Sequence, residues 1–189
     1  MPLHSPSTDL LRYDSGRVLL LLLAPGEPMS EPVDYIDYTR RTYDALGYTP
    51  YAWVENEALS ALSPLPCPIS EASLTLIASG GIYRKGQRAF HFKDDSSFRL
   101  IDTDTPTDEL RVTHFAYDLR DARSDPNVVF PLEGLRDMVA EKRLGQLTSK
   151  AITFMGGIYS SRRVKEELAP KVVQEVRDQR ADIALLVPV

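Results

Sequence analysis

The chain has 189 residues, of which 22 are Lys or Arg and 27 are Asp or Glu, so its formal net charge is −5. This length fits one compact domain. A content of 43% hydrophobic and 26% charged residues excludes wholesale disorder and fibrous architectures. The acidic balance argues against a nucleic-acid partner, because phosphate contacts need clustered Lys and Arg. The single cysteine, Cys67, excludes an internal disulfide framework and a Cys-rich zinc site, and we expect a cytoplasmic protein.

Residues 1–34 are predicted to form an irregular N-terminal segment, because prolines interrupt any long element. Residues 18–24 (VLLLLLA) are an apolar run far shorter than the ~20 residues that a membrane helix needs, so we expect no membrane partner. Asp9 and Asp14 precede this run, and no convincing small-x-small cleavage site follows it, which argues against a signal peptide. We interpret the run as a local helix or a docking segment.

Residues 35–189 are predicted to form a single α/β domain. Its first element is a helix, since apolar residues recur at near-helical spacing from Val33 and Gly47 is a natural stop. A proline-rich connector over residues 62–69 cannot be a central strand, because its prolines remove ladder donors. Residues 74–79 (LTLIAS) are then typical of a strand that is buried on both faces.

Further strand and helix patterns follow along the chain. Residues 94–101 predict a polar turn and a short strand, and residues 110–115 (LRVTHF) predict another strand. A helix is predicted to begin at Pro131, whose missing N–H is least harmful in the first turn. Residues 151–155 (AITFM) form a second pattern of a buried strand.

The last third of the chain completes the alternation. Residues 162–180 predict a helix that Pro170 breaks or restarts. Its inward face is predicted to hold Val172, Val173 and Val176. Residues 182–189 (DIALLVPV) form a third pattern of a buried strand. Strands that alternate with helices predict a doubly wound, mostly parallel sheet with helices on both faces, and such sheets bind ligands beyond the carboxyl ends of their strands.

The same four residues, Gly-Gly-Ile-Tyr, follow two of the predicted strands. The first copy contains Gly80 and Gly81 after Ser79, and the second contains Gly156 and Gly157. Glycine pairs let backbone N–H groups face an anion or a small polar ligand, so the copies fit two walls of one small-molecule site. They equally fit two tight strand exits with the tyrosine packed on the sheet edge. Neither copy has the spacing of a dinucleotide fingerprint or a P-loop, so a nucleotide cofactor is not supported.

Other polar residues give weaker signals. His114 ends a predicted strand, where it is either an acid, base or orienting group near neutral pH or a structural histidine bonded to the backbone. Asp125 and Asn127 flank a proline in a turn signature, and residues 94–95 (DD) are more typical of solvated charge than of a metal site. Cys67 lies between two prolines with nothing local to lower its pKa, so we interpret it as inert.

Several short motifs occur in order along the chain. They are residues 48–51 (YTPY), 77–83 (IASGGIY), 90–92 (FHF), 94–95 (DD), 114–118 (HFAYD), Asp125, Asn127, and residues 130–132 (FPL), 144–145 (LG), 154–159 (FMGGIY) and 181–189 (ADIALLVPV). Through these motifs the chain resembles the glycine/sarcosine/betaine reductase selenoprotein B family from about residue 35 to 189, and more closely the short homologues of that family. Their order and spacing, more than any single motif, make the resemblance specific.

The resemblance implies an oxidoreductase subunit that cleaves a C–N bond of a small amino-acid-like substrate reductively. In that family the final strand is followed at once by a selenocysteine or cysteine and a second cysteine, which this chain lacks. We therefore expect the redox residue directly beyond Val189, encoded by a UGA codon that was read as a stop, and a domain that lacks its C-terminal part. The family's complexes activate the amine with a pyruvoyl or similar carbonyl group on another subunit, and no such cofactor is expected in this chain.

The resemblance also assigns candidate site residues. His114 is the candidate catalytic residue, which would protonate the leaving amine. The candidate substrate-binding residues are Ser79, Gly80, Gly81, Asp125, Asn127, Gly156, Gly157 and Pro188. No metal site is expected.

Two further hypotheses stay open. One is a non-catalytic small-molecule-binding or partner subunit without a redox centre. The other is a generic hydrolase or nucleotide-binding protein, which the lack of G-x-S-x-G and phosphate-loop patterns disfavours. Expected partners are a small-molecule substrate, and subunits of a reductase complex or a second copy of the chain. A missing covering helix would leave apolar surface near residues 184–189, where we expect the association.

Overall fold

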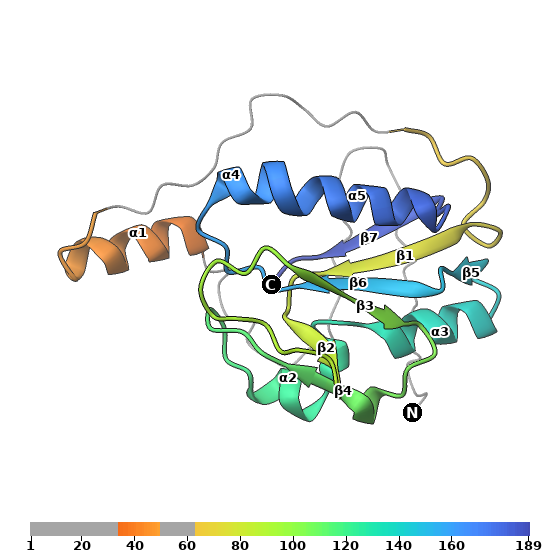
Figure 1. Cartoon of the computed structure of the whole chain (residues 1–189), viewed down its shortest axis with the longest axis horizontal. Coiled ribbons are helices and arrows are strands. Elements are labelled where there is room, and N and C mark those ends of the chain that lie inside the picture. Colours follow the sequence, from red (N-terminus) through yellow and green to blue (C-terminus); the bar gives the residue numbers. More distant parts are fainter. Residues whose placement is uncertain (1–33, 50–62) are drawn as a thin grey trace, which may run out of the picture. The chain divides into compact units, whose positions relative to one another are not determined.

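The computed structural model describes residues 34–49 and 63–189, drawn in colour in Figure 1. The chain divides into two units, residues 1–53 and residues 54–189, which we describe separately. The predicted apolar run at residues 18–24 lies outside the described residues, and the domain boundary at residues 34 and 35 stays a prediction.

The described part of the first unit is helix α1, Tyr35–Ala45. The Asp34 side chain caps it by accepting hydrogen bonds from the backbone N–H groups of Ile36 (3.0 Å) and Asp37 (3.1 Å). Gly47 follows the helix at φ +69°, a left-handed conformation that glycine adopts readily. The helix predicted before Gly47 is therefore confirmed.

The second unit is built on a mixed, mostly parallel sheet. Its strands are β1 (Ser73–Ala78), β3 (Phe98–Asp102), β5 (Gln146–Leu147), β6 (Lys150–Phe154) and β7 (Ile183–Val187). Strand β1 pairs in parallel with β5, β6 and β7, and β3 pairs antiparallel with β6. All six residues of β1 are buried, as expected for a central strand covered on both faces.

Helices cover both faces of the sheet (Figure 1). On one face a continuous helical segment runs through α4 (Ser161–Arg163), a π-helical turn (Val164–Leu168) and α5 (Ala169–Asp178). Leu168 and Val172 pack there against Ile77 and Ile152. The other face packs against α3 (Leu132–Ala140) and α2 (Arg120–Ser124), with the 3₁₀ turns Thr107–Glu109 and Pro126–Val128 nearby in the chain. The α/β fold with helices on both faces is thus confirmed.

Three local predictions differ from the structure. The strand predicted over residues 110–115 is only β4 (Leu110–Val112), which pairs antiparallel with β2 (Ile82–Arg84) in a separate two-stranded sheet. Pro170 does not break the helix, because it lies in the first turn of α5 after the π-helical turn. Val173 was predicted to face inward, but it is 46% exposed.

Strand β7 was predicted to be buried on both faces, but its residues alternate between half-buried and exposed. Leu185 and Val187 pack against the core shared with α3, whereas Leu186 is 65% exposed. The reason is position: among the described strands β7 pairs only with β1 and forms an edge of the sheet. A continuous apolar run therefore does not by itself distinguish a central strand from an uncovered edge strand.

Candidate functional site at the strand ends

The carboxyl ends of β1, β6 and β7 meet at Ser79, which is 9% exposed. The backbone N–H of Ser79 donates to the carbonyl of Val187 (3.1 Å), and its carbonyl accepts from the N–H of Gly156 (2.8 Å). Its hydroxyl oxygen accepts from the backbone N–H of Val189 (2.9 Å). One residue thus joins the ends of three strands, at the edge where a sheet of this kind binds ligands.

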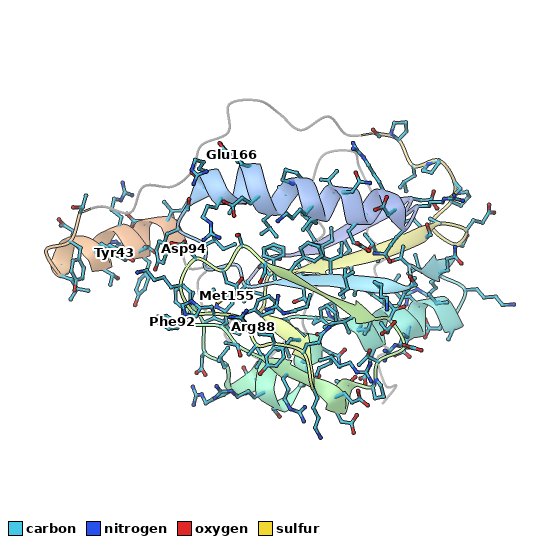
Figure 2. The ribbon with its side chains drawn as sticks, in the orientation of Figure 1. Tyr43, Arg88, Phe92, Asp94, Met155 and Glu166 are labelled. Atoms are coloured by element: carbon cyan, nitrogen blue, oxygen red, sulfur yellow. The ribbon has the colours of Figure 1, made fainter. Side chains whose placement is uncertain are left out.

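The two glycine pairs lie against each other at this edge. Gly80 forms an isolated antiparallel bridge with Met155, and the N–H of Gly81 donates to the carbonyl of Phe154 (3.0 Å). Figure 2 labels Met155 where the ends of β1 and β6 come together. The N–H groups of Gly81 and Gly156 are therefore bound to protein carbonyls. This corrects the expectation that they would face an anion.

The glycines are required here by space and backbone conformation. Gly81 has φ +72°, and a Cβ on it would lie 2.0 Å from the carbonyl oxygen of Thr113. A Cβ on Gly80 would lie 2.9 Å from the side chain of Val129, and one on Gly157 would lie 2.5 Å from the ring of Phe115. Close approach of neighbouring chain segments thus accounts for both pairs.

The two copies of Gly-Gly-Ile-Tyr have different structures beyond the glycines. Ile82 and Tyr83 of the first copy begin β2, and Tyr83 is half-buried with its ring edge-on to Phe90. In the second copy Tyr159 is 70% exposed and precedes α4. The repeat therefore marks two strand exits of similar geometry, and only the glycines and the adjacent Ser79 meet.

His114 lies beside the first glycine pair. Its Cβ is 3.5 Å from the position that a Cβ on Gly81 would take. Its ring is 4.7 Å from that of Tyr117, whose hydroxyl donates to the carbonyl of Gly80 (2.8 Å). Sequence reasoning did not single out Tyr117, although it lies three residues after His114 in the HFAYD motif.

The protonation state of His114 follows from its surroundings. The residue is 7% exposed, and burial lowers the pKa of its imidazole below the ordinary value. Nδ1 accepts a hydrogen bond from the backbone N–H of Ala116 (3.0 Å), so the neutral ring carries its proton on Nε2. Nε2 is buried and has no hydrogen-bond partner among residues 34–49 and 63–189. A buried donor without a partner is a common feature of sites that bind a ligand.

Asp125 and Asn127 serve a local turn. The Asp125 carboxylate accepts from the backbone N–H and the side-chain amide of Asn127, both at 2.9 Å. Asn127 also bonds to Glu133, through both its amide nitrogen (3.0 Å) and its carbonyl oxygen (3.0 Å). Within the part of the chain that the structure describes, no hydrogen bond joins either residue to Ser79 or His114. Their turn signature is confirmed, and their role in substrate binding stays a prediction.

The acidic pair Asp94 and Asp95 organises the loop before β3. Asp94, labelled in Figure 2, accepts from the backbone N–H groups of Tyr159 (2.7 Å) and Ser160 (3.2 Å) at the start of α4. Asp95 accepts from the backbone N–H of His91 (2.8 Å). No group of three or more His, Cys, Asp or Glu side chains arranged to hold a metal occurs in residues 34–49 or 63–189.

An apolar groove of about 530 Å³ runs between α5 and β7 and reaches Ser79 and Pro188 at one end. We call it the α5–β7 groove; its walls include Ile77, Phe154, Leu168, Val172, Val173 and Leu186. Leu186 and Val189 are 65% and 44% exposed beside it. Apolar surface near residues 184–189 was expected and is present, whereas association through it stays a prediction.

Two remaining expectations concern Cys67 and membranes. Burial and the carboxylates of Asp182 and Glu71 raise the pKa of the Cys67 thiol, so little thiolate forms at neutral pH and the inert interpretation is supported. No helix in the described ranges is long and apolar enough to cross a membrane.

The fold and the strand-end geometry define an α/β protein with a candidate small-molecule site beyond the carboxyl ends of β1, β6 and β7. The chain belongs to the glycine/sarcosine/betaine reductase selenoprotein B family, whose sequence profile matches residues 50–188. The family resemblance inferred from the motifs is thereby confirmed.

Comparison with curated proteins gives a relative of known composition. The chain is 27% identical over 124 residues to the D-proline reductase subunit gamma of Acetoanaerobium sticklandii. The alignment covers 66% of this chain and 51% of that subunit, so the chain spans about half the length of this relative. No solved structure matches the chain significantly.

Proposed function

We propose that this chain is part of an oxidoreductase subunit that cleaves a C–N bond of a small amino-acid-like substrate reductively. The observation that supports the proposal most strongly is the meeting of three strand ends at Ser79, beside the buried and unpartnered Nε2 of His114. Family membership adds that reductase subunits share this sequence pattern.

The proposed redox residue is a selenocysteine or cysteine placed directly after Val189. The residues at the strand ends fit such a group, because the Nε2–H of His114 offers a donor that no described residue uses. The glycine pairs keep Cβ atoms out of the same region. A selenol is ionised at neutral pH without tuning, and a thiol in such a position needs a nearby donor or cation.

Such a residue would supply two-electron chemistry: its anion displaces the amine from carbon, and a second thiol then releases the carbon as C–H, leaving both chalcogens oxidised until an external dithiol reduces them. The chain's own contribution is His114. A substrate carboxylate or a chalcogen anion beside Nε2 would raise the pKa of the imidazole, because opposite charge favours the protonated form. The imidazolium would then give its proton to the departing amine nitrogen.

The substrate class follows from the relatives alone. The family description names glycine, sarcosine and betaine, and the curated relative is a subunit of D-proline reductase. We therefore propose a small amino acid or N-substituted amino acid as substrate, other reductase subunits as partners and the cytoplasm as location. The second thiol and the amine-activating carbonyl group would come from outside the described residues.

The test compares two forms of the protein: the chain ending at Val189, and a frame extended through the following codon as cysteine or selenocysteine. Each is incubated with dithiothreitol and with glycine, sarcosine, betaine or D-proline, and amine release is followed by mass spectrometry. We expect product only from the extended form, with at least a tenfold loss on His114→Gln, as is usual for a lost acid–base group. Equal activity of both forms would refute the proposed redox residue.

A non-catalytic binding or partner subunit is the alternative, favoured by the absence of any second cysteine besides Cys67 in the sequence. It predicts that no homologous coding frame follows Val189, and that both forms bind the amino acids equally by calorimetry. Translation of the nucleotides downstream of Val189 separates the two: a frame with Cys-His within a few residues supports the reductase.

A further inference from the structure

We propose that Ser79 is a positioning residue: its hydroxyl holds the backbone of Val189 and so sets where the next residue enters the site. This inference rests on the proposed function, since the next residue is the proposed redox centre. Neither the family description nor the relative's name assigns a role to this serine.

The side chain of Ser79 has a role that its backbone does not share. The backbone N–H and carbonyl bind Val187 and Gly156, and a residue of any type at this position would make those two bonds. The bond to the N–H of Val189 is made by the hydroxyl oxygen at 2.9 Å and therefore depends on the identity of the residue. Strand β7 ends at Val187, so this hydroxyl is what continues the attachment of the chain beyond the strand.

The surroundings make the hydroxyl hard to replace. Ser79 is 9% exposed and lines the apolar end of the α5–β7 groove with Ile77 and Phe154, which leaves little room for a water molecule as substitute acceptor. A Cβ on Gly156 would lie 3.0 Å from the Cβ and 3.1 Å from the hydroxyl oxygen of Ser79. The glycine at 156 thus leaves the space that the hydroxyl occupies.

Hydrogen exchange tests the contact in the chain ending at Val189. We expect Ser79→Ala to speed exchange of the Val189 amide about three- to tenfold, the factor for one lost hydrogen bond, and Ser79→Thr to retain most of the protection. Gly156→Ala should also speed exchange, since the added methyl displaces the hydroxyl while Ser79 stays. Ser149→Ala, an exposed serine, is the matched control and should change nothing. Unchanged exchange in both Ser79→Ala and Gly156→Ala would overturn the proposal.

Thiol reactivity tests the consequence in the cysteine-extended chain. The rate constant and pH midpoint of iodoacetamide alkylation should move in Ser79→Ala to those of an unstructured cysteine peptide, and Ser79→Thr should restore them. If the parent thiol already behaves like the peptide, the proposed redox centre fails, and the exchange result still decides the hydroxyl contact. If the parent thiol is reactive and Ser79→Ala leaves it unchanged, the positioning role is wrong and the proposed function stands.

Discussion

Replacing Gly81 by alanine probes the packing of the candidate site directly. The residue has φ +72°, and a Cβ there would lie 2.0 Å from the carbonyl oxygen of Thr113. That oxygen is not free to move, because the N–H of Thr113 donates to the carbonyl of Gly81 (2.9 Å) and the adjacent strands β2 and β4 are paired. Gly81→Ala therefore adds a steric conflict to a strained backbone.

The expected loss of stability has two parts. A left-handed conformation costs a residue with a Cβ roughly 1–2 kcal/mol. Overpacking against a fixed neighbour adds roughly 1–3 kcal/mol. We thus expect Gly81→Ala to lower the free energy of unfolding by about 2–5 kcal/mol, a large fraction of the ~5–15 kcal/mol of a typical domain.

Two glycines of the same unit provide matched controls. Gly86 has φ +92° and nothing within 4 Å of an added Cβ, so Gly86→Ala should cost only the backbone part, about 1–2 kcal/mol. Gly134 lies in α3 with open space around it and should stabilise by up to about 1 kcal/mol when changed to alanine. Urea unfolding followed by circular dichroism measures all three at constant m-value. The reasoning is refuted if Gly81→Ala is no more destabilising than Gly86→Ala.

Three further outcomes are expected. The pKa of His114 is lowered in the folded state, so the free energy of unfolding should fall as pH drops below about 6.5, the unfolded value; His114→Gln should flatten that fall in urea titrations at pH 5.5 and 7.5, and an equally steep fall would contradict it. Gly157→Ala should destabilise by about 1–3 kcal/mol through the ring of Phe115, and a double-mutant cycle with Phe115→Ala should recover most of the loss; additive effects would argue against the contact. Asp182→Ala should cost about 1–3 kcal/mol, because its carboxylate accepts from the N–H (2.9 Å) and hydroxyl (3.0 Å) of Ser73; an unchanged melting temperature would show that the bonds are dispensable.

The sequence contained enough information to predict the main sheet and its helices. Residues 74–79 and 151–155 are continuous apolar runs, and a strand buried on both faces produces that pattern. The two-stranded sheet of β2 and β4 was not predictable in the same way. Its strands have three residues each, and their pairing is fixed by contacts distant in sequence.

The candidate site was predicted in place but not in detail. The glycine pairs indicated the correct edge of the sheet, because tight exits after strands need glycine. Their N–H groups nevertheless bond to Phe154 and Ser79, since two exits that lie side by side satisfy each other. The hydroxyl contact of Ser79 with Val189 joins positions 110 residues apart and leaves no local sequence signal.

The central claim is that a redox-active selenocysteine or cysteine follows Val189. The most direct measurement is tandem mass spectrometry of the protein isolated from its natural source, after alkylation and proteolysis. We predict a peptide that reads through the final Val-Pro-Val into an alkylated selenocysteine or cysteine. A natural C-terminal peptide that ends at Val189, or one that continues without either residue, would contradict the account.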